Sequence, residues 1–539
     1  MINHKFLTQN FSGLSLQNSL VFTKLTPTIK LLALVFLFVV LPGCTRPFPG
    51  TNNNENTTTT AVATTTNIQA SPIATTEPIV IQMGTAVPPY NGTPTPDAPH
   101  PVGSISGAAT THAVTEGETL GTIALDYDTT VDELVLLNGI EDSDFVYAGQ
   151  VLNVPTTAEE NRLTPNFKII PDSELVYGPA AKDFDVRAFT TALDGYLLTY
   201  TEEVEGQIID GPAIVQLVAD RYSINPRLLL TAIERHSGWV TQKNVANTIY
   251  PLGKQDSERE GLYLQLNWAA NLINFGYYGR SEGGLTTMFT NDGTEVAFDG
   301  DINHGTAGLQ LYLGAVDGNT YSRWQAEVGA DGFVQTYFRL FGNPFAYSVD
   351  PLIPADLTQP PFALPWPVGE SWHYSGGPHA AWNTGSSWAA VDFVPPGTQS
   401  GCYLAEDWVT SMTDGEVTRS GFGAVVVDLD GDGYAGTGWA LTYMHLDNRD
   451  RIGVGTAVQT GDQLGHPGCE GGVSNGTHLH IARSYNGRWI AADGALPIVM
   501  AGWVSQGAGY EYNGWLTKNG ISVEADAVRS TENAIMAGQ

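Results

Sequence analysis

The stretch Gly476-Thr477-His478-Leu479-His480-Ile481, near the C-terminal end of the chain, decides the fold of the segment around it. Side chains two residues apart on a β-strand share one face, so His478 and His480 point one way while Leu479 points into the core. That arrangement suits one metal ligand with a catalytic group beside it. The stretch therefore predicts a buried strand that carries a metal site.

Three segments upstream supply further candidates. Residues 439–446 are typical of a second strand, which ends at His445, and residues 391–397 place Asp392 on a third, buried strand. Residues 376–379 bring the imidazole of His379 ahead of that strand. Two histidines, one carboxylate and a water form a tetrahedral zinc site with one open position, which is the catalytic arrangement.

These elements in this order resemble the M23 (lysostaphin/LytM-like) metallopeptidases of bacterial cell walls. The resemblance covers residues 365–490 and includes MTDGEV, YMHL, IGVGTAVQTGDQLGHPG and GTHLHI. It implies a β-rich zinc metalloendopeptidase that cleaves the peptide cross-links of peptidoglycan. It also implies that His379, Asp392 and His480 hold Zn²⁺, while His445 and His478 act on the water and on the developing oxyanion. The metal lowers the pKa of its water, and a neutral imidazole takes the proton.

One spacing departs from the family pattern. The first family motif sets its histidine close before the aspartate, whereas His379 lies thirteen residues before Asp392. An inserted loop, residues 380–390, must fold back for the ligands to converge, and His373 is a rival first ligand. His466 lies in a Gly-Pro turn and is expected to be structural.

An acidic loop lies in the same segment. It imitates the start of a calcium-binding EF-hand loop through Asp428, Asp430, Asp432 and Gly433. The twelfth position of that loop is Trp439, not a bidentate glutamate. Because the loop lies between two expected strands, a hairpin turn is the preferred interpretation.

The N-terminal region predicts export. An apolar run, residues 31–41, follows Lys30 and leads into Leu-Pro-Gly-Cys ending at Cys44, and it is too short to span a bilayer. The tetrapeptide resembles a bacterial lipobox, which implies that residues 1–44 are a signal peptide and that Cys44 is lipidated. The alternative is an uncleaved anchor. Cys402 and Cys469 then remain, and outside the cytoplasm we expect them to form a disulfide.

Two segments follow the expected anchor. Residues 45–110 are rich in Thr and Pro and predict a disordered tether, since they cannot bury enough apolar area to offset the entropy of ordering. Residues 111–155 then read as strand, helix capped by Thr119, second helix and strand. This βααβ order resembles a LysM domain, which implies binding of N-acetylglucosamine glycans such as peptidoglycan. The alternative is a LysM fold that has lost its sugar groove.

Residues 165–350 predict a mainly α-helical middle domain. Asp210 caps one helix, and Asn225-Pro226 begins the next, which ends near Glu234. The stretch around Glu234 is similar to the start of lysozyme-like transglycosylase domains, which implies a general acid at that position. Because Arg235 and His236 interrupt the pattern, a spacer or second substrate-contacting surface is the preferred interpretation. Residues 501–539 form the C-terminal tail, which is expected to be loosely structured beyond residue 515.

The composition narrows the function classes. The chain carries 24 Lys and Arg against 56 Asp and Glu, and this net charge of −32 argues against a nucleic-acid binder. We expect a multidomain, extracytoplasmic, lipid-anchored and cell-wall-associated protein, whose peptidase domain spans residues 362–500. Its partners would be peptidoglycan glycan at the LysM module, the peptide stem at the peptidase domain and the membrane at the anchor.

Two other functions stay open at this point. The first is a non-enzymatic peptidoglycan-binding scaffold or amidase-activator-like protein. The second is a bifunctional wall hydrolase that uses Glu234. The complete set of expected ligands favours the enzyme over the scaffold.

Overall fold

The computed structural model describes residues 109–155, with gaps at 116–117, 128–130 and within 132–145, and residues 163–538. The expected signal peptide, Cys44 and nearly all of the tether lie outside the described residues. Within the described part of the chain, no helix combines the length and the apolar character that crossing a membrane requires.

The LysM-like module pairs its two ends. Strand β1 (Ala109–Ala113) runs antiparallel to β2 (Val151–Pro155), and α2 (Leu120–Asp126) lies between them in the sequence. Thr119 caps α2 by accepting a hydrogen bond from the Thr122 backbone N–H at 3.2 Å, as the sequence predicts. Only single positions of the expected second helix are described, and one of them, Leu134, is buried in the small core.

The middle of the chain is mainly helical, as expected. Asp210 caps α7 by accepting from the Ala213 backbone N–H, and Asn225 caps α8 with its side-chain oxygen. The longest helix, α9, packs against α10 so closely that a Cβ on Gly276 would lie 2.7 Å from the Gly308 Cα. The helices are α4 (Asp172–Leu175), α5 (Val186–Leu193), α6 (Tyr196–Thr199), α7 (Gly211–Tyr222), α8 (Pro226–Ser237), α9 (Leu262–Ser281), α10 (His304–Ala315), α11 (Tyr321–Val328) and α12 (Phe333–Phe341). Two hairpins join them, β3 (Thr201–Val204) with β4 (Gln207–Asp210) and β5 (Thr287–Phe289) with β6 (Glu295–Ala297).

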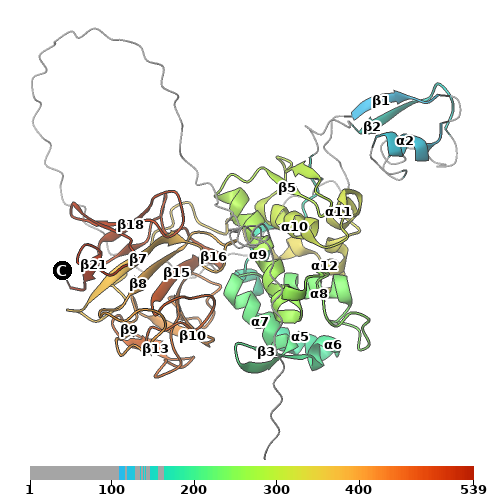
Figure 1. Ribbon diagram of the computed structural model, residues 1–539. Helices are drawn as coiled ribbons and strands as arrows, with labels where there is room; N and C mark the ends of the chain where they lie inside the picture. The colour runs from blue at the N-terminus through green and yellow to red at the C-terminus, as the bar shows by residue number, and fades with distance from the viewer. Residues whose placement is uncertain are drawn as a thin grey trace, which may run out of the picture. The chain divides into compact units, whose positions relative to one another are not determined.

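The C-terminal half is built on one antiparallel sheet. Its strands follow the order β13-β10-β11-β12-β15-β8-β7-β21, and Figure 1 shows β7, β8 and β15 side by side. The members are β7 (Ser371–His379), β8 (Ala390–Val394), β10 (Gly415–Gly421), β11 (Ala424–Asp428), β12 (Trp439–Met444), β13 (Ala457–Val458), β15 (Leu479–Tyr485), β16 (Arg488–Trp489), which pairs with β15 at the side, and β21 (Ala534–Met536). A short separate pair, β9 (Val409–Thr410) and β14 (Gln463–Gly465), lies outside this sheet.

The two faces of the sheet pack against different hydrophobic clusters. Leu479, Ile481 and Phe393 point into the core of the β-rich domain. The opposite face carries small or flexible residues, among them Ala390 and Met444, which share one hydrophobic cluster with the helical domain. Because side chains alternate along a strand, Asp392 lies on the same face as Ala390. The candidate metal ligands therefore share a face with the surface that the helical domain covers.

The expectation of a loose tail is wrong. Strands β17 (Val499–Met500), β18 (Trp503–Gly507), β19 (Gly514–Lys518) and β20 (Ile521–Glu524) form a four-stranded antiparallel sheet, and β21 pairs with β7. The β19–β20 turn is Asn519-Gly520, with φ of 50° and 80°. An Asn-Gly pair between two strands is a strong hairpin signal because both residues tolerate positive φ. The sequence contained this signal, and the prediction overlooked it.

Candidate metal centre

Three adjacent strands bring the expected ligands together. His379 is the last residue of β7, Asp392 is the middle residue of β8, and His480 is the second residue of β15. His480 lies directly opposite Asp392 in the β15–β8 register. All three residues are buried, with at most 7 % of their surface exposed.

The ligand atoms form a small triangle. His379 Nε2 lies 3.0 Å from His480 Nδ1 and 3.3 Å from Asp392 Oδ1. His480 Nδ1 lies 3.2 Å from the same carboxylate oxygen. Ligand atoms around a tetrahedral zinc ion, bound at about 2.0–2.1 Å, are themselves about 3.3 Å apart. The spacing of the three atoms therefore fits one zinc ion.

The ring nitrogens of His379 and His480 that face away from the triangle decide which nitrogen of each ring carries the proton. His379 Nδ1 lies 2.8 Å from the Gly377 carbonyl, and His480 Nε2 lies 3.0 Å from the Ala381 carbonyl. A carbonyl only accepts, so in the neutral rings both protons sit on these outer nitrogens and both lone pairs face the triangle. Asp392 Oδ1 is buried without a hydrogen-bond partner among the described residues. Two lone pairs and an orphaned carboxylate oxygen converge where a cation satisfies all three.

The charge state of the triangle agrees with this fit. Burial raises the pKa of Asp392, but the adjacent imidazoles of His379 and His478 hold it well below its ordinary range, so the carboxylate is ionised. Burial lowers the pKa of His379, yet Asp392 raises it above the ordinary value. Burial lowers the pKa of His480. Metal binding must displace a proton from His379 in acid, which makes the affinity dependent on pH.

Two further histidines flank the triangle. His445 directly follows β12 with a φ of 63°, a left-handed conformation that is strained for a residue with a side chain. Its Nδ1 donates to the Glu470 carbonyl at 3.0 Å, and its ring centroid lies 4.3 Å from that of His478. Burial and the neighbouring His478 hold the pKa of His445 well below its ordinary value. His445 is therefore neutral at pH 7 and keeps a free lone pair on Nε2.

His478 sits at the edge of the same group. Its Nδ1 donates to the Gly476 carbonyl at 2.8 Å, and its Nε2 lies 3.8 Å from Asp392 Oδ2. Leu479 is fully buried in the core, so the alternation predicted for this stretch holds where β15 begins.

The structure places His379, and not its rival, beside Asp392. His373 also lies on β7, but its Nδ1 contacts the Ser530 carbonyl and Asn533 Oδ1, at 3.0 and 3.2 Å. Residues 380–389 absorb the long spacing by folding back on themselves, with the Ala381 N–H bonded to the Ser387 carbonyl at 2.9 Å.

One residue of the site escaped the sequence analysis. Tyr512 stacks on His379, with ring centroids 4.2 Å apart and 21° between the planes. Two main-chain hydrogen bonds hold it there, because Gly377 N–H donates to its carbonyl and its own N–H donates to the Pro378 carbonyl. Burial and Asp392 raise the pKa of Tyr512 to about 12, so it keeps its hydroxyl proton. It comes from the C-terminal tail, residues 501–539, for which the sequence predicted no functional residue.

A disulfide supports the same region. Cys402 and Cys469 are joined with their Cα atoms 5.9 Å apart. Cys469 precedes Glu470, whose carbonyl orients His445. Cys402 lies between residues 401 and 403, which hydrogen-bond Thr477 just before His478.

The other candidate residues lie elsewhere. Glu234 is buried at the end of α8, and its carboxylate accepts from Thr241 Oγ1, the Thr241 N–H and Arg339 at 2.7, 3.1 and 3.2 Å. These bonds tie the end of the helix to the following loop and occupy both carboxylate oxygens. His466 is buried against Trp408 and donates to the Asp407 carbonyl, in keeping with a structural role.

The acidic loop lies between the paired strands β11 and β12, as the hairpin interpretation predicts. Its three aspartates gather within 4.8 Å of one another, and Lys182 of the helical domain pairs with Asp432. Burial and Asp430 raise the pKa of Asp428 to about 7.

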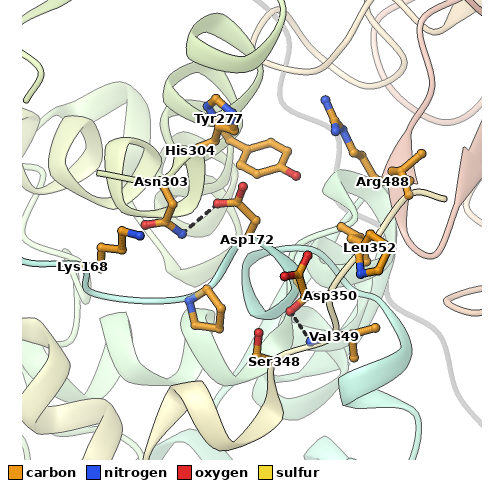
Figure 2. A pocket seen from close by; sticks show the side chains of 14 residues that line it. Lys168, Asp172, Tyr277, Asn303, His304, Ser348, Val349, Asp350, Leu352 and Arg488 are labelled. Atoms are coloured by element: carbon orange, nitrogen blue, oxygen red, sulfur yellow. Dashed lines mark hydrogen bonds between the residues drawn. The ribbon is translucent and has the colours of Figure 1, made fainter. Parts of the chain in front are cut away.

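A cavity of about 460 Å³ lies outside the candidate metal centre. Figure 2 shows it lined by helical-domain residues together with Arg488 of the β-rich domain. Asp172 on its wall accepts from Asn303 Nδ2 at 2.8 Å and from the Gly305 N–H at 2.7 Å. None of the three expected metal ligands lines it.

Two family models match parts of this chain. Residues 112–155 match the family model of the LysM domain, and residues 168–355 match that of the LasA N-terminal domain. Protease LasA from two strains of Pseudomonas aeruginosa is 28 % identical over 346 residues, which cover 60 % of this chain and 75 % of the relative. The match of the middle domain is thus to LasA, a relationship that the sequence analysis did not identify.

Two solved structures are also similar to part of this chain. The M23 metalloprotease pseudoalterin from the deep sea is 26 % identical with a TM-score of 0.26, covering 32 % of this chain and 96 % of that chain. The catalytic domain of lysostaphin from Staphylococcus simulans is 23 % identical with a TM-score of 0.17, covering 23 % and 89 %. The LysM and LasA matches confirm the resemblance stated from sequence: the chain carries a LysM domain and is similar to protease LasA.

Proposed function

We propose that the protein is a zinc metalloendopeptidase that cleaves peptide cross-links of peptidoglycan. The observation that carries this proposal is the convergence of His379 Nε2, Asp392 Oδ1 and His480 Nδ1 within 3.3 Å of one another. The neutral His445 and the adjacent His478 supply the acid–base groups that peptide hydrolysis needs.

The hydrogen bonds of each residue indicate its role in peptide hydrolysis. The triangle of His379, Asp392 and His480 would hold Zn²⁺, which would supply Lewis-acid activation of the scissile carbonyl and of a water. His445, whose Nδ1 proton is held by the Glu470 carbonyl, would offer the lone pair of Nε2 as a general base. His478, whose Nε2 lies 3.8 Å from Asp392 Oδ2, would stand beside the developing oxyanion.

We propose further that the LysM domain holds the enzyme on peptidoglycan glycan and that lipidated Cys44 anchors it to the membrane. The LysM match supports glycan binding, and the apolar run before Cys44 supports the anchor. This arrangement places the enzyme outside the cytoplasm, next to the wall.

The test is product analysis of purified peptidoglycan incubated with the soluble protein from residue 45 onward. The reaction is run with and without a chelator, and with the His480→Ala variant as control. Release of new peptide termini that is lost with chelator and in the variant supports the proposal and identifies the bond. Retention on the sediment without cleavage supports the scaffold instead. New reducing ends would move the chemistry to the helical domain and to Glu234.

A further inference from the structure

The ligand loop, residues 380–389, connects the first expected metal ligand to the strand of the second. Most of the loop is buried, since Ala381, Ser386, Ser387 and Ala389 are fully buried and Trp382 is 8 % exposed. Its tip, Asn383 and Thr384, is exposed. Main-chain and side-chain bonds close it on itself, with the Trp382 N–H donating to Ser386 Oγ at 2.8 Å. These bonds fold the loop back on itself.

The helical domain contacts this loop at several points. Asn271 of α9 accepts from the Gly385 N–H at 2.8 Å and donates to Thr384 Oγ1 at 3.2 Å. A Cβ on Gly385 would lie 2.0 Å from the Asn271 carbonyl, so only glycine permits this approach.

The helical domain makes a second set of contacts with Trp382, Asn383 and Ser387 of the loop. Ser387 donates to Glu282 at 2.7 Å, and Tyr222 accepts from the Asn383 amide at 3.0 Å. The Arg221 guanidinium lies 4.7 Å from the centre of the Trp382 ring, within the range of a cation–π contact.

The same loop contacts a metal ligand from its other side. The Ala381 carbonyl accepts the Nε2 proton of His480 at 3.0 Å, which selects the tautomer whose Nδ1 lone pair faces the triangle. The Ala381 N–H is in turn bonded to the Ser387 carbonyl at 2.9 Å. A continuous chain of bonds thus runs from Glu282 through Ser387 and Ala381 to His480.

We propose that the helical domain is part of the metal centre's support, with Asn271 and Glu282 as positioning residues for His480 through the ligand loop. This inference rests on the proposed function, since it concerns the affinity of the same zinc site. Partners one shell beyond the ligands typically change metal affinity 10- to 100-fold, as an order of magnitude. Asn271 acts through the loop backbone, since it binds Gly385 and Thr384 and not Ala381 itself, so we expect a loss of about tenfold when its amide is removed.

The experiment compares two asparagines of the helical domain in the full chain. Asn271→Ala removes one donated and one accepted hydrogen bond to the loop. Asn291→Ala removes the same pair of bonds, to Asp317 Oδ1 and from the Gly318 N–H, at a place that does not contact the loop. The zinc dissociation constant is measured by competition with a chromophoric chelator, and the visible spectrum of the Co²⁺ form reports the ligand geometry. Asn271→Asp keeps the oxygen that accepts from Gly385 and should restore most of the affinity.

The expected result is a dissociation constant raised about tenfold and an altered cobalt spectrum in Asn271→Ala, with neither change in Asn291→Ala. Ser387→Ala, which breaks the bond to Glu282 from the loop side, should act in the same direction and serves if Asn271→Ala does not fold. Equal zinc affinity in the wild type, Asn271→Ala and Ser387→Ala would overturn this inference and leave the proposed function intact. Failure of the wild type to bind zinc would instead contradict the proposed function.

Discussion

Removal of the disulfide should destabilise the peptidase domain by an amount that follows from its loop. Cys402 and Cys469 are 67 residues apart in the sequence. The chain-entropy relation gives about 4 kcal/mol for a cross-link that closes a loop of this length. The double variant Cys402→Ser with Cys469→Ser should therefore lose about 4 kcal/mol of free energy of unfolding.

Native-state hydrogen exchange measures this loss within the full chain. Amides in the centre of β12 and β15 are buried in the sheet and exchange only when the domain unfolds. Since a factor of ten in an equilibrium constant corresponds to about 1.4 kcal/mol, their exchange should accelerate about 10³-fold. Amides of β1 and β2 in the LysM domain lie outside the loop and serve as the internal control.

The refuting result is equally defined. Acceleration of less than about tenfold at β12 and β15 would mean that the cross-link restricts the unfolded chain far less than its length implies. Equal acceleration in the LysM strands would show a general effect of the variant and not the release of this loop.

Three shorter predictions follow from the site and the helical domain. Tyr512→Ala should weaken zinc binding by up to about tenfold, because an aromatic pair contributes about 0.5–1.5 kcal/mol, whereas Tyr512→Phe keeps the ring and should leave the affinity unchanged in chelator competition. Gly376→Ala should abolish zinc binding in the same assay, since its Cβ would lie 2.7 Å from Asp392 Oδ2, and retained affinity would contradict the position of this carboxylate. Burial lowers the pKa of His236 to about 4, while the unfolded chain keeps the ordinary value of 6.5. The unfolded state therefore binds the additional proton between these values, and stability should fall by up to about 3 kcal/mol as the pH drops through this window. Urea unfolding of the wild type and His236→Gln at pH 7.5 and 4.5 tests this, and an equal loss in both proteins would refute it.

The elements that depend on local signals were predictable. Side-chain alternation placed Leu479 in the core and His480 on the opposite face, and the strand around Asp392 lies where its apolar neighbours indicate. Capping residues marked the starts of helices correctly at Thr119, Asp210 and Asn225. These features depend on the alternation of side chains along a strand or on one capping side chain that bonds the nearby backbone. A few neighbouring residues are therefore enough to predict each of them.

Three features of the site needed the tertiary structure. The choice between His373 and His379 depends on β7, whose pairing with β8 shifts register twice between them, so counting along the strand cannot show which one faces Asp392. Tyr512 reaches His379 from the connection between β18 and β19, two strands of a separate sheet.

The support of the ligand loop also escaped prediction, because Asn271 lies more than a hundred residues before the loop that it binds. By itself, the sequence determined the class of domain, the strands and the chemical types of the ligands, because these depend on neighbouring residues. Only the tertiary structure decided which histidine joins the triangle and what holds it there, because contacts between distant segments follow from strand register and domain packing.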